Sequence, residues 1–211
     1  ISNILVDHIM NLSISFILRL NIVVAICMFA IIGNSQKKEK LLNKFNQIKL
    51  TDLSGDKKQL ETIFSEYQYG IILFLNDECP ICHYYAPYLN SLDSIAALYN
   101  VKFIGVFSGS YKKIQVNDFK TSYNIKTSLF IDTKFKLAKS LDATVTPEIF
   151  FISLVDLTVK YKGLIDDKYL GLGLKRSYVT QNYILEALEN YFNRLDFLSY
   201  ETKPIGCLIN Y

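Results

Sequence analysis

The stretch that decides the fold runs from Ile71 to Asn90 and reads IILFLNDECPICHYYAPYLN. It opens with an apolar run of β-branched and aromatic residues, which is typical of a buried strand. A polar turn follows, and then Cys79 and Cys82 stand two residues apart at the start of a helical pattern. A thiol at a helix start lies near free backbone N–H groups that favour the thiolate, and a second thiol one turn later can close a disulfide. The stretch therefore predicts a redox-active Cys-x-x-Cys.

Two prolines extend this pattern. Pro87 falls eight residues after Cys79, where it interrupts the helix, and Pro147 heads a later apolar strand. With these features the sequence resembles the thioredoxin superfamily, which has a proline in the active-site helix and a cis-proline beside the cysteines. The resemblance implies a cis Thr146–Pro147 bond, and it implies that Thr146 and Pro147 offer their backbone to an extended substrate segment. An ordinary trans proline at the head of the strand is the alternative.

The chain between Cys79 and Pro147 is longer than in a minimal thioredoxin, by roughly one strand and one helix over 126–142. Such an insertion resembles the redoxin (AhpC/TSA) branch, which includes peroxiredoxins and TlpA-like extracytoplasmic thiol oxidoreductases. The resemblance covers about Phe45 to the end of the chain. We therefore expect an α/β, thioredoxin-like fold with a central mixed β-sheet flanked by helices. The extra strand and helix are expected between the active-site helix and the cis-proline.

Hydrophobic periodicity and turn residues divide this region into elements. The expected elements are a small strand or hairpin around 45–56, helices over 59–67, 80–99, 114–123, 135–141 and 180–192, and strands over 71–75, 101–107, 128–131, 147–152 and 159–165.

Residues 1–35 have the pattern of an export signal. Arg19 supplies positive charge, the apolar run 20–32 follows, and the small residues of Gly33-Asn34-Ser35 suit a signal peptidase. Cleavage after Ser35 would leave 36–211 as the thioredoxin-like domain.

Two other interpretations of the N-terminal segment stay open. Residues 13–33 are almost long enough to span a bilayer as an uncleaved tether, although Arg19 interrupts them. A lipid-anchored form would use Cys27, but Ile26 stands where a small residue is expected. Every version predicts an extracytoplasmic domain, periplasmic or secreted.

The composition limits the number of domains and the kinds of partner that we expect. The chain has 211 residues, half of them hydrophobic, and a net charge of +3. This suits one globular domain and gives no reason to expect a nucleic-acid partner.

The sequence also departs from common thioredoxins. Leu73 stands where many have a buried aspartate, and Glu78 stands where they have a tryptophan. Asp77 and Glu78 would oppose a thiolate at Cys79, so the redox potential is left open.

The expected chemistry is dithiol–disulfide exchange with protein thiols and disulfides. Cys79 attacks a disulfide as thiolate, and Cys82 resolves the mixed disulfide. The family resemblance implies recycling by a membrane thiol-electron carrier. Cys207 is either a packed small residue, a third redox thiol that docks near Cys79, or a thiol that pairs between chains, and Gly206 before it permits a tight turn.

Several rival interpretations use the same residues. A peroxidase of the peroxiredoxin kind would have Thr where Asn76 stands, and a non-catalytic binding module would leave Cys79 unreactive. The run Cys79-Pro-Ile-Cys82-His83 matches a haem-attachment pattern, but His8, Met10 and Met28, the possible second ligands, lie in the expected signal segment. A zinc site needs four ligands, and the only Cys or His candidates after the expected signal segment are Cys79, Cys82, His83 and Cys207. The adjacent Cys82 and His83 would point in different directions on a helix. We therefore expect no cofactor and no metal, and we expect His83 on the helix surface.

Overall fold

The computed structural model describes residues 42–193 and 200–211. The predicted signal or anchor segment, 1–35, and the predicted tether, 13–33, lie outside the described residues. Within the part of the chain that the structure describes, no helix is both long and apolar enough to cross a membrane.

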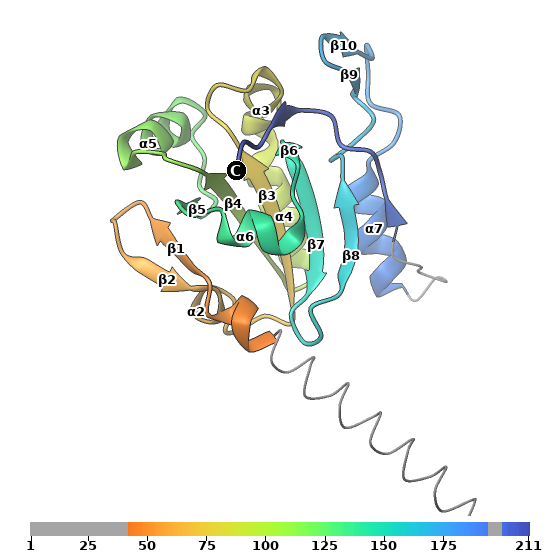
Figure 1. Cartoon of the computed structure of the whole chain (residues 1–211). Helices are drawn as coiled ribbons and strands as arrows, with labels where there is room; N and C mark the ends of the chain where they lie inside the picture. The colour runs from red at the N-terminus through yellow and green to blue at the C-terminus, as the bar shows by residue number, and fades with distance from the viewer. Residues whose placement is uncertain (1–41, 194–199) are drawn as a thin grey trace, which may run out of the picture. The chain divides into compact units, whose positions relative to one another are not determined.

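An eight-stranded mixed sheet forms the centre of the domain, in the order β11-β8-β7-β3-β4-β5-β1-β2 (Figure 1). The strands are β1 (Lys49–Asp52), β2 (Lys57–Gln59), β3 (Tyr69–Leu75), β4 (Val101–Ser108), β5 (Leu129–Asp132), β7 (Glu148–Ser153), β8 (Val159–Gly163) and β11 (Tyr200–Glu201). β3, β4 and β5 run parallel, whereas β7 runs antiparallel to β3. The strand that precedes the cysteines therefore lies in the middle of the sheet.

The helices cover both faces of this sheet. They are α2 (Leu60–Ile63), α3 (Pro80–Tyr85), the 3-10 turn η1 (Ala86–Tyr88), α4 (Leu89–Leu98), α5 (Lys113–Ser122), α6 (Lys136–Leu141) and α7 (Tyr183–Phe192). Figure 1 shows α6 on the viewer's side of the sheet and α4 on the far side. Pro87 lacks an N–H and lies in η1, so the long helix expected after Cys79 is divided into α3 and α4, as the sequence predicted.

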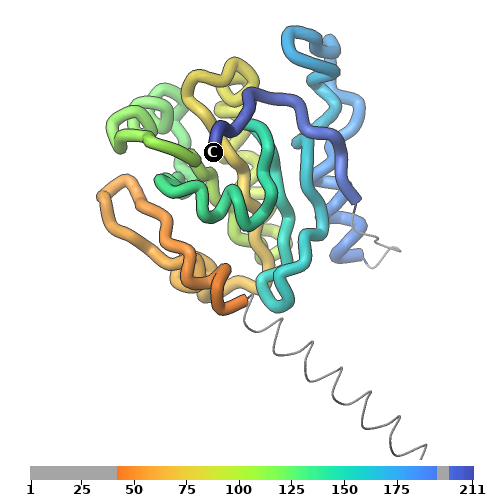
Figure 2. Tube along the Cα trace, viewed as in Figure 1, coloured from red at the N-terminus to blue at the C-terminus, as the bar shows by residue number. Residues whose placement is uncertain are grey.

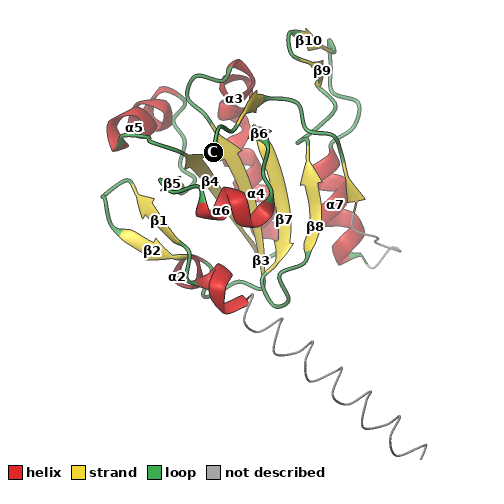
Figure 3. Ribbon diagram, viewed as in Figure 1, coloured by secondary structure: helices red, strands yellow, loops and turns green. Residues whose placement is uncertain are grey.

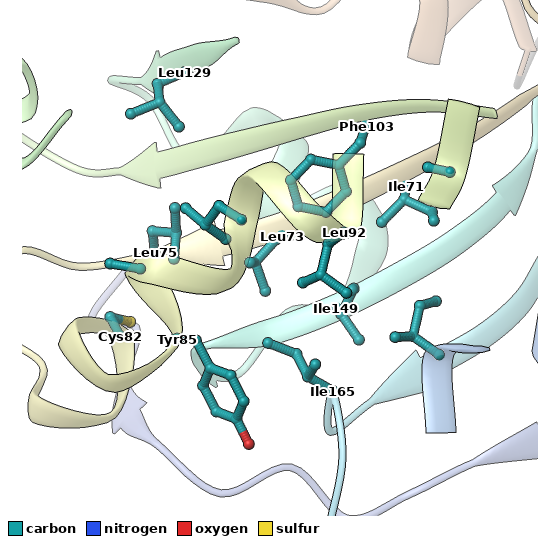
Figure 4. Close-up of a cluster of buried hydrophobic side chains, with 14 of the residues drawn as sticks. Ile71, Leu73, Leu75, Cys82, Tyr85, Leu92, Phe103, Leu129, Ile149 and Ile165 are labelled. Carbon is teal, nitrogen blue, oxygen red and sulfur yellow. The ribbon is translucent and has the colours of Figure 1, made fainter. Parts of the chain in front are cut away.

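Two apolar cores result from the alternation of side chains along β3. Ile71, Leu73 and Leu75 point into one core, with Cys79, Cys82 and residues of α4, α5 and α7. Ile72 and Phe74 point into the other core, with residues of α2 and α6. Figure 4 shows part of the first core, in which Cys82 lies at the start of the helical segment near Leu75 and Tyr85.

Some element boundaries differ from the sequence expectation. The helix expected over 59–67 is the single turn α2, because the chain leaves the helix at Phe64 and packs that ring over Gly70. The helix expected from residue 180 begins at Tyr183, where Asn182 caps it. Leu98, expected among the apolar positions of its helix, is 82% exposed, because it lies away from the face that buries Leu92 and Ala96.

The extra strand and helix expected over 126–142 are β5 and α6. Two small strand pairs lie outside the main sheet. β9 (Tyr169–Gly171) pairs with β10 (Leu174–Lys175), and β12 (Cys207–Leu208) pairs with β6 (Val145–Thr146). Figures 2 and 3 show that the last residues of the chain return to the region of α3 and β6.

Candidate functional site

Cys79 lies where the strand β3 has ended and the helix α3 begins. Its backbone is extended, with φ −86° and ψ 115°, and Pro80 is the first residue of α3. The preceding turn is fixed locally, because the Asn76 side chain accepts the N–H of Glu78 at 2.7 Å. The backbone N–H of His83 donates to the Cys79 carbonyl at 3.1 Å, which starts the helix. Cys82 therefore lies one helical turn after Cys79, and both residues are buried.

The two thiols have opposite proton affinities. The pKa of Cys79 is lowered, chiefly by a hydrogen bond from the Cys82 thiol and also by hydrogen bonds from Cys207, which together outweigh its burial. The pKa of Cys82 is raised, first by burial and then by its hydrogen bond with Cys79. The opposition expected from Asp77 and Glu78 is therefore outweighed. Cys79 is suited to be the nucleophile, and Cys82 to hold a proton until it is needed.

The loop before Pro147 forms the wall next to Cys79. The Thr146–Pro147 peptide bond is cis, as the resemblance implied. Cys79 Sγ lies 3.1 Å from the carbonyl oxygen of Thr146. Glu148, which is buried, holds this loop by accepting the N–H of Thr144 at 2.7 Å and of Val145 at 3.3 Å. The backbone of Thr146 is thereby presented to the thiol.

The C-terminal strand lies along this same loop. In the antiparallel pair of β12 and β6, Cys207 is opposite Thr146 and Leu208 is opposite Val145. The Ile209 N–H donates to the Thr144 carbonyl at 2.9 Å. The thiol and the backbone N–H of Cys207 both contribute hydrogen bonds to Cys79. The structure therefore brings Cys79, Cys82, Thr146, Pro147 and Cys207 together, although Cys207 is far from the others in sequence.

The pKa of the Cys207 thiol is raised. Burial is the first cause, and the hydrogen bond and charge interaction with Cys79 follow. These surroundings favour the protonated form of the Cys207 thiol beside Cys79.

The aromatic residues after Cys82 have structural partners. The Tyr85 hydroxyl donates to the buried carboxylate of Asp166, and burial raises the pKa of both groups. Tyr84 packs edge-on against the ring of Tyr169, with 5.5 Å between the centroids. These contacts join α3 to the segment that leads into β9, and sequence reasoning missed them because the partners are distant in the chain.

His83, which the sequence predicted on the helix surface, is half-buried. Its Nδ1 lies 2.7 Å from the Tyr123 hydroxyl, and its Nε2 lies 2.6 Å from the Asp77 carbonyl. Both ring nitrogens therefore bind the protein itself. Among residues 42–193 and 200–211, no group of three or more His, Cys, Asp or Glu side chains is arranged to hold a metal ion.

A cleft of about 260 Å³ is lined by Glu78, Thr146 and Leu208, which are neighbours of the cysteines, but not by the cysteines themselves. It is open to solvent and is lined by the turn 76–78, the loop 108–111, Thr146 and residues 208–210. One of its walls is therefore the C-terminal strand itself.

Comparison with known proteins gives a family and a fold. The model of the AhpC/TSA family matches residues 41–162. No functionally curated protein matches the chain.

Similar solved structures include a hypothetical protein from Sinorhizobium meliloti 1021, with 20% identity, a TM-score of 0.66, and coverage of 77% of this chain and 90% of that one. An uncharacterized conserved protein from Geobacillus kaustophilus has 21% identity and a TM-score of 0.65, with coverage of 78% and 88%. A thioredoxin-like protein from Aeropyrum pernix has 16% identity and a TM-score of 0.49, with coverage of 62% and 88%. The expected thioredoxin-like fold, a mixed sheet flanked by helices, is confirmed by the sheet order, the family match and the first two of these structures.

Proposed function

We propose that the protein is a thiol-disulfide oxidoreductase that acts through Cys79 and Cys82. The chain belongs to the AhpC/TSA family, and this family and the fold together identify a redox enzyme. The observation that carries the proposal is the placement of two buried thiols one helical turn apart at the start of α3, beside the cis Thr146–Pro147 bond, and the opposite shifts in their pKa support it. A stabilised thiolate attacks readily at neutral pH, and a protonated neighbour is held back until the first bond has formed.

The exchange proceeds in two displacements. The Cys79 thiolate attacks one sulfur of an incoming disulfide, and the other sulfur leaves as a thiolate. Cys82 then loses its proton and attacks Cys79 Sγ, which closes the Cys79–Cys82 disulfide and releases the first sulfur. Two electrons pass from the dithiol to the incoming disulfide, and the reverse sequence oxidises a dithiol.

The proposed substrates are protein thiols and disulfides. The backbone of Thr146, next to Pro147, lies beside Cys79 Sγ, and an extended segment that took the place of β12 at this edge would bring a sulfur up to Cys79. The contact that Cys207 makes in the same place supports this use of the edge.

The proposed location is extracytoplasmic. It rests on the export-signal pattern of residues 1–35, with residues 13–33 as the alternative tether. An oxidised Cys79–Cys82 pair outside the cytoplasm needs a source of electrons, so we propose a membrane thiol-electron carrier as the partner.

Reduction of insulin with dithiothreitol as the reductant tests the proposal. Cys79→Ser and Cys82→Ser are each expected to lower the rate by at least about 100-fold, because neither can complete the exchange. Cys27→Ser, the same change at a cysteine outside the motif, is the control and is expected to keep the rate. Oxidised protein recovered after turnover should contain a Cys79–Cys82 disulfide by peptide mass. A Cys79→Ser protein with the wild-type rate would contradict the proposal.

A thiol peroxidase is the second candidate, because the redoxin branch includes peroxiredoxins and the Cys79 thiolate could attack a peroxide. Peroxide consumption in the same dithiothreitol system distinguishes the two. We expect hydrogen peroxide to be consumed far more slowly than insulin is reduced. The opposite ranking would make the peroxidase the primary function.

A further inference from the structure

The C-terminal strand occupies the edge that a substrate segment would use. β12 pairs antiparallel with β6, and its cysteine stands directly opposite Thr146, whose carbonyl oxygen lies 3.1 Å from Cys79 Sγ. The chain thus carries its own extended segment, with a thiol at the position that an incoming sulfur must take.

Close backbone contact keeps this strand in one register. A Cβ atom on Gly206 would clash with the carbonyl oxygen of Thr146 and lie 2.7 Å from its carbonyl carbon. The Tyr211 hydroxyl donates to the Ala143 carbonyl, and its ring packs edge-on against Phe135 at 5.6 Å between centroids. The strand is therefore anchored on both sides of Cys207, and its thiol is directed at Cys79.

Access to solvent differs among the three thiols. Cys79 and Cys82 are both 0% exposed, whereas Cys207 is partly exposed. With β12 in place, Cys207 is therefore the residue of the three that offers surface to a protein outside. The most exposed of the three cysteines is thus Cys207, which lies outside the Cys-x-x-Cys motif.

We propose that Cys207 is a third redox thiol, which forms a disulfide with Cys79 and carries the exchange between the buried Cys79–Cys82 pair and protein substrates at the surface. This inference rests on the proposed function and names the route by which that same site is reached.

The relay needs no electrons beyond those of the exchange. In the oxidised protein the Cys207 thiolate attacks Cys79 Sγ, the Cys79–Cys207 bond forms, and the Cys79–Cys82 bond breaks. Cys82 leaves as a thiolate and takes the proton that Cys207 lost. A substrate thiolate then attacks Cys207 Sγ and displaces Cys79. Because a thiol of lower pKa leaves faster, Cys79 is the better leaving group of that disulfide. A second substrate thiolate releases Cys207, and the reverse order reduces a substrate disulfide.

The first test traps the relay bond. A Cys27→Ser, Cys82→Ser protein is oxidised at low concentration with diamide, which accepts the two electrons, and its peptides are mapped without reduction. We expect a Cys79–Cys207 disulfide within one chain in most of the protein. Cys207→Ser in the same background is the control and should leave Cys79 unlinked. Oxidation that yields only links between chains, or none, would overturn the inference.

The second test asks whether the bond is on the reaction path. Cys207→Ser is expected to slow insulin reduction by about tenfold or more, because Cys79 is then reached only when β12 leaves β6. Lys203→Ala, at an exposed residue of the same C-terminal segment that lies outside β12 and the cleft, is the control and should keep the rate. An unchanged or faster Cys207→Ser protein would overturn the inference, since β12 would then be a passive cover.

These outcomes separate the inference from the proposed function. Cys207→Ser must still form the Cys79–Cys82 disulfide with diamide. A Cys207→Ser protein that keeps both this disulfide and the wild-type rate would overturn the relay through Cys207 but not the proposed function. A Cys79→Ser protein that reduces insulin at the wild-type rate would overturn the proposed function.

Discussion

At the scale of single residues, the site depends on the different surroundings of two cysteines, Cys79 and Cys82. Cys79 receives hydrogen bonds from two other thiols, whereas Cys82 is enclosed in the apolar core. The sulfur of Cys79 is therefore suited to be a nucleophile, whereas the thiol of Cys82 stays protonated. No charged side chain has to contact Cys79 for this difference to arise.

Titration of Cys79 follows from these hydrogen bonds. Because they lower its pKa, the thiolate should persist as the pH falls well below 8.5, roughly the ordinary cysteine value. The ultraviolet absorbance of the thiolate, taken as the difference between the wild type and Cys79→Ser, measures this directly. Cys207→Ala removes one donor and should move the midpoint upward. A wild-type midpoint near the ordinary value would contradict the account.

At the scale of elements, short strands and loop carboxylates position the site. β6 and β12 are two residues each, yet they set the register between Cys207 and Thr146. The inserted β5–α6 unit is held by Asp132, which accepts the N–H groups of Lys136, Leu137 and Ala138. Local polar contacts, rather than long regular elements, fix these segments.

Gly206 is expected to tolerate no side chain. In Gly206→Ala the new methyl group meets the Thr146 carbonyl, so β12 should separate from β6 and expose Cys79. The measurement is the rate at which a bulky maleimide labels Cys79 in a Cys207→Ser background, with an expected rise of about tenfold or more. Gly171→Ala is the matched control, because nothing lies within 4 Å of its Cβ position. Equal labelling of the two variants would show that β12 does not cover Cys79.

Asp132→Ala is expected to destabilise the domain. It leaves three backbone N–H groups at the start of α6 without their acceptor, at a cost of about 2–4 kcal/mol. Urea unfolding measures the loss, and Asp118→Ala, at an exposed carboxylate, should change stability by less than about 0.5 kcal/mol. A loss of the same size in both variants would contradict the capping role.

At the scale of the whole molecule, the sequence predicts the features that rest on local patterns. The strand before Cys79, the break at Pro87, the cis bond at Pro147 and the insertion over 126–142 each follow from periodicity, proline chemistry or the family resemblance. The domain around them is the expected mixed sheet between two layers of helices.

Contacts between distant parts of the chain were not predictable in the same way. The pair of β6 and β12 joins residues 61 positions apart, and the Tyr85–Asp166 bond joins residues 81 positions apart. A strand of two residues has no measurable periodicity, and a single buried hydrogen bond leaves no pattern in the sequence. Cys207 could be recognised as a spare thiol, but only the fold brings it to Cys79.

The reduction potential of the Cys79–Cys82 pair tests the central claim most directly. Full-length protein is equilibrated in glutathione or dithiothreitol buffers, and the state of each cysteine is read by peptide mass after rapid alkylation. Stabilisation of the Cys79 thiolate favours the reduced form, so the account predicts reversible oxidation at a potential above that of thioredoxin, roughly −270 mV. A value below about −300 mV, which is typical of structural disulfides, or the absence of any Cys79–Cys82 disulfide, would contradict it.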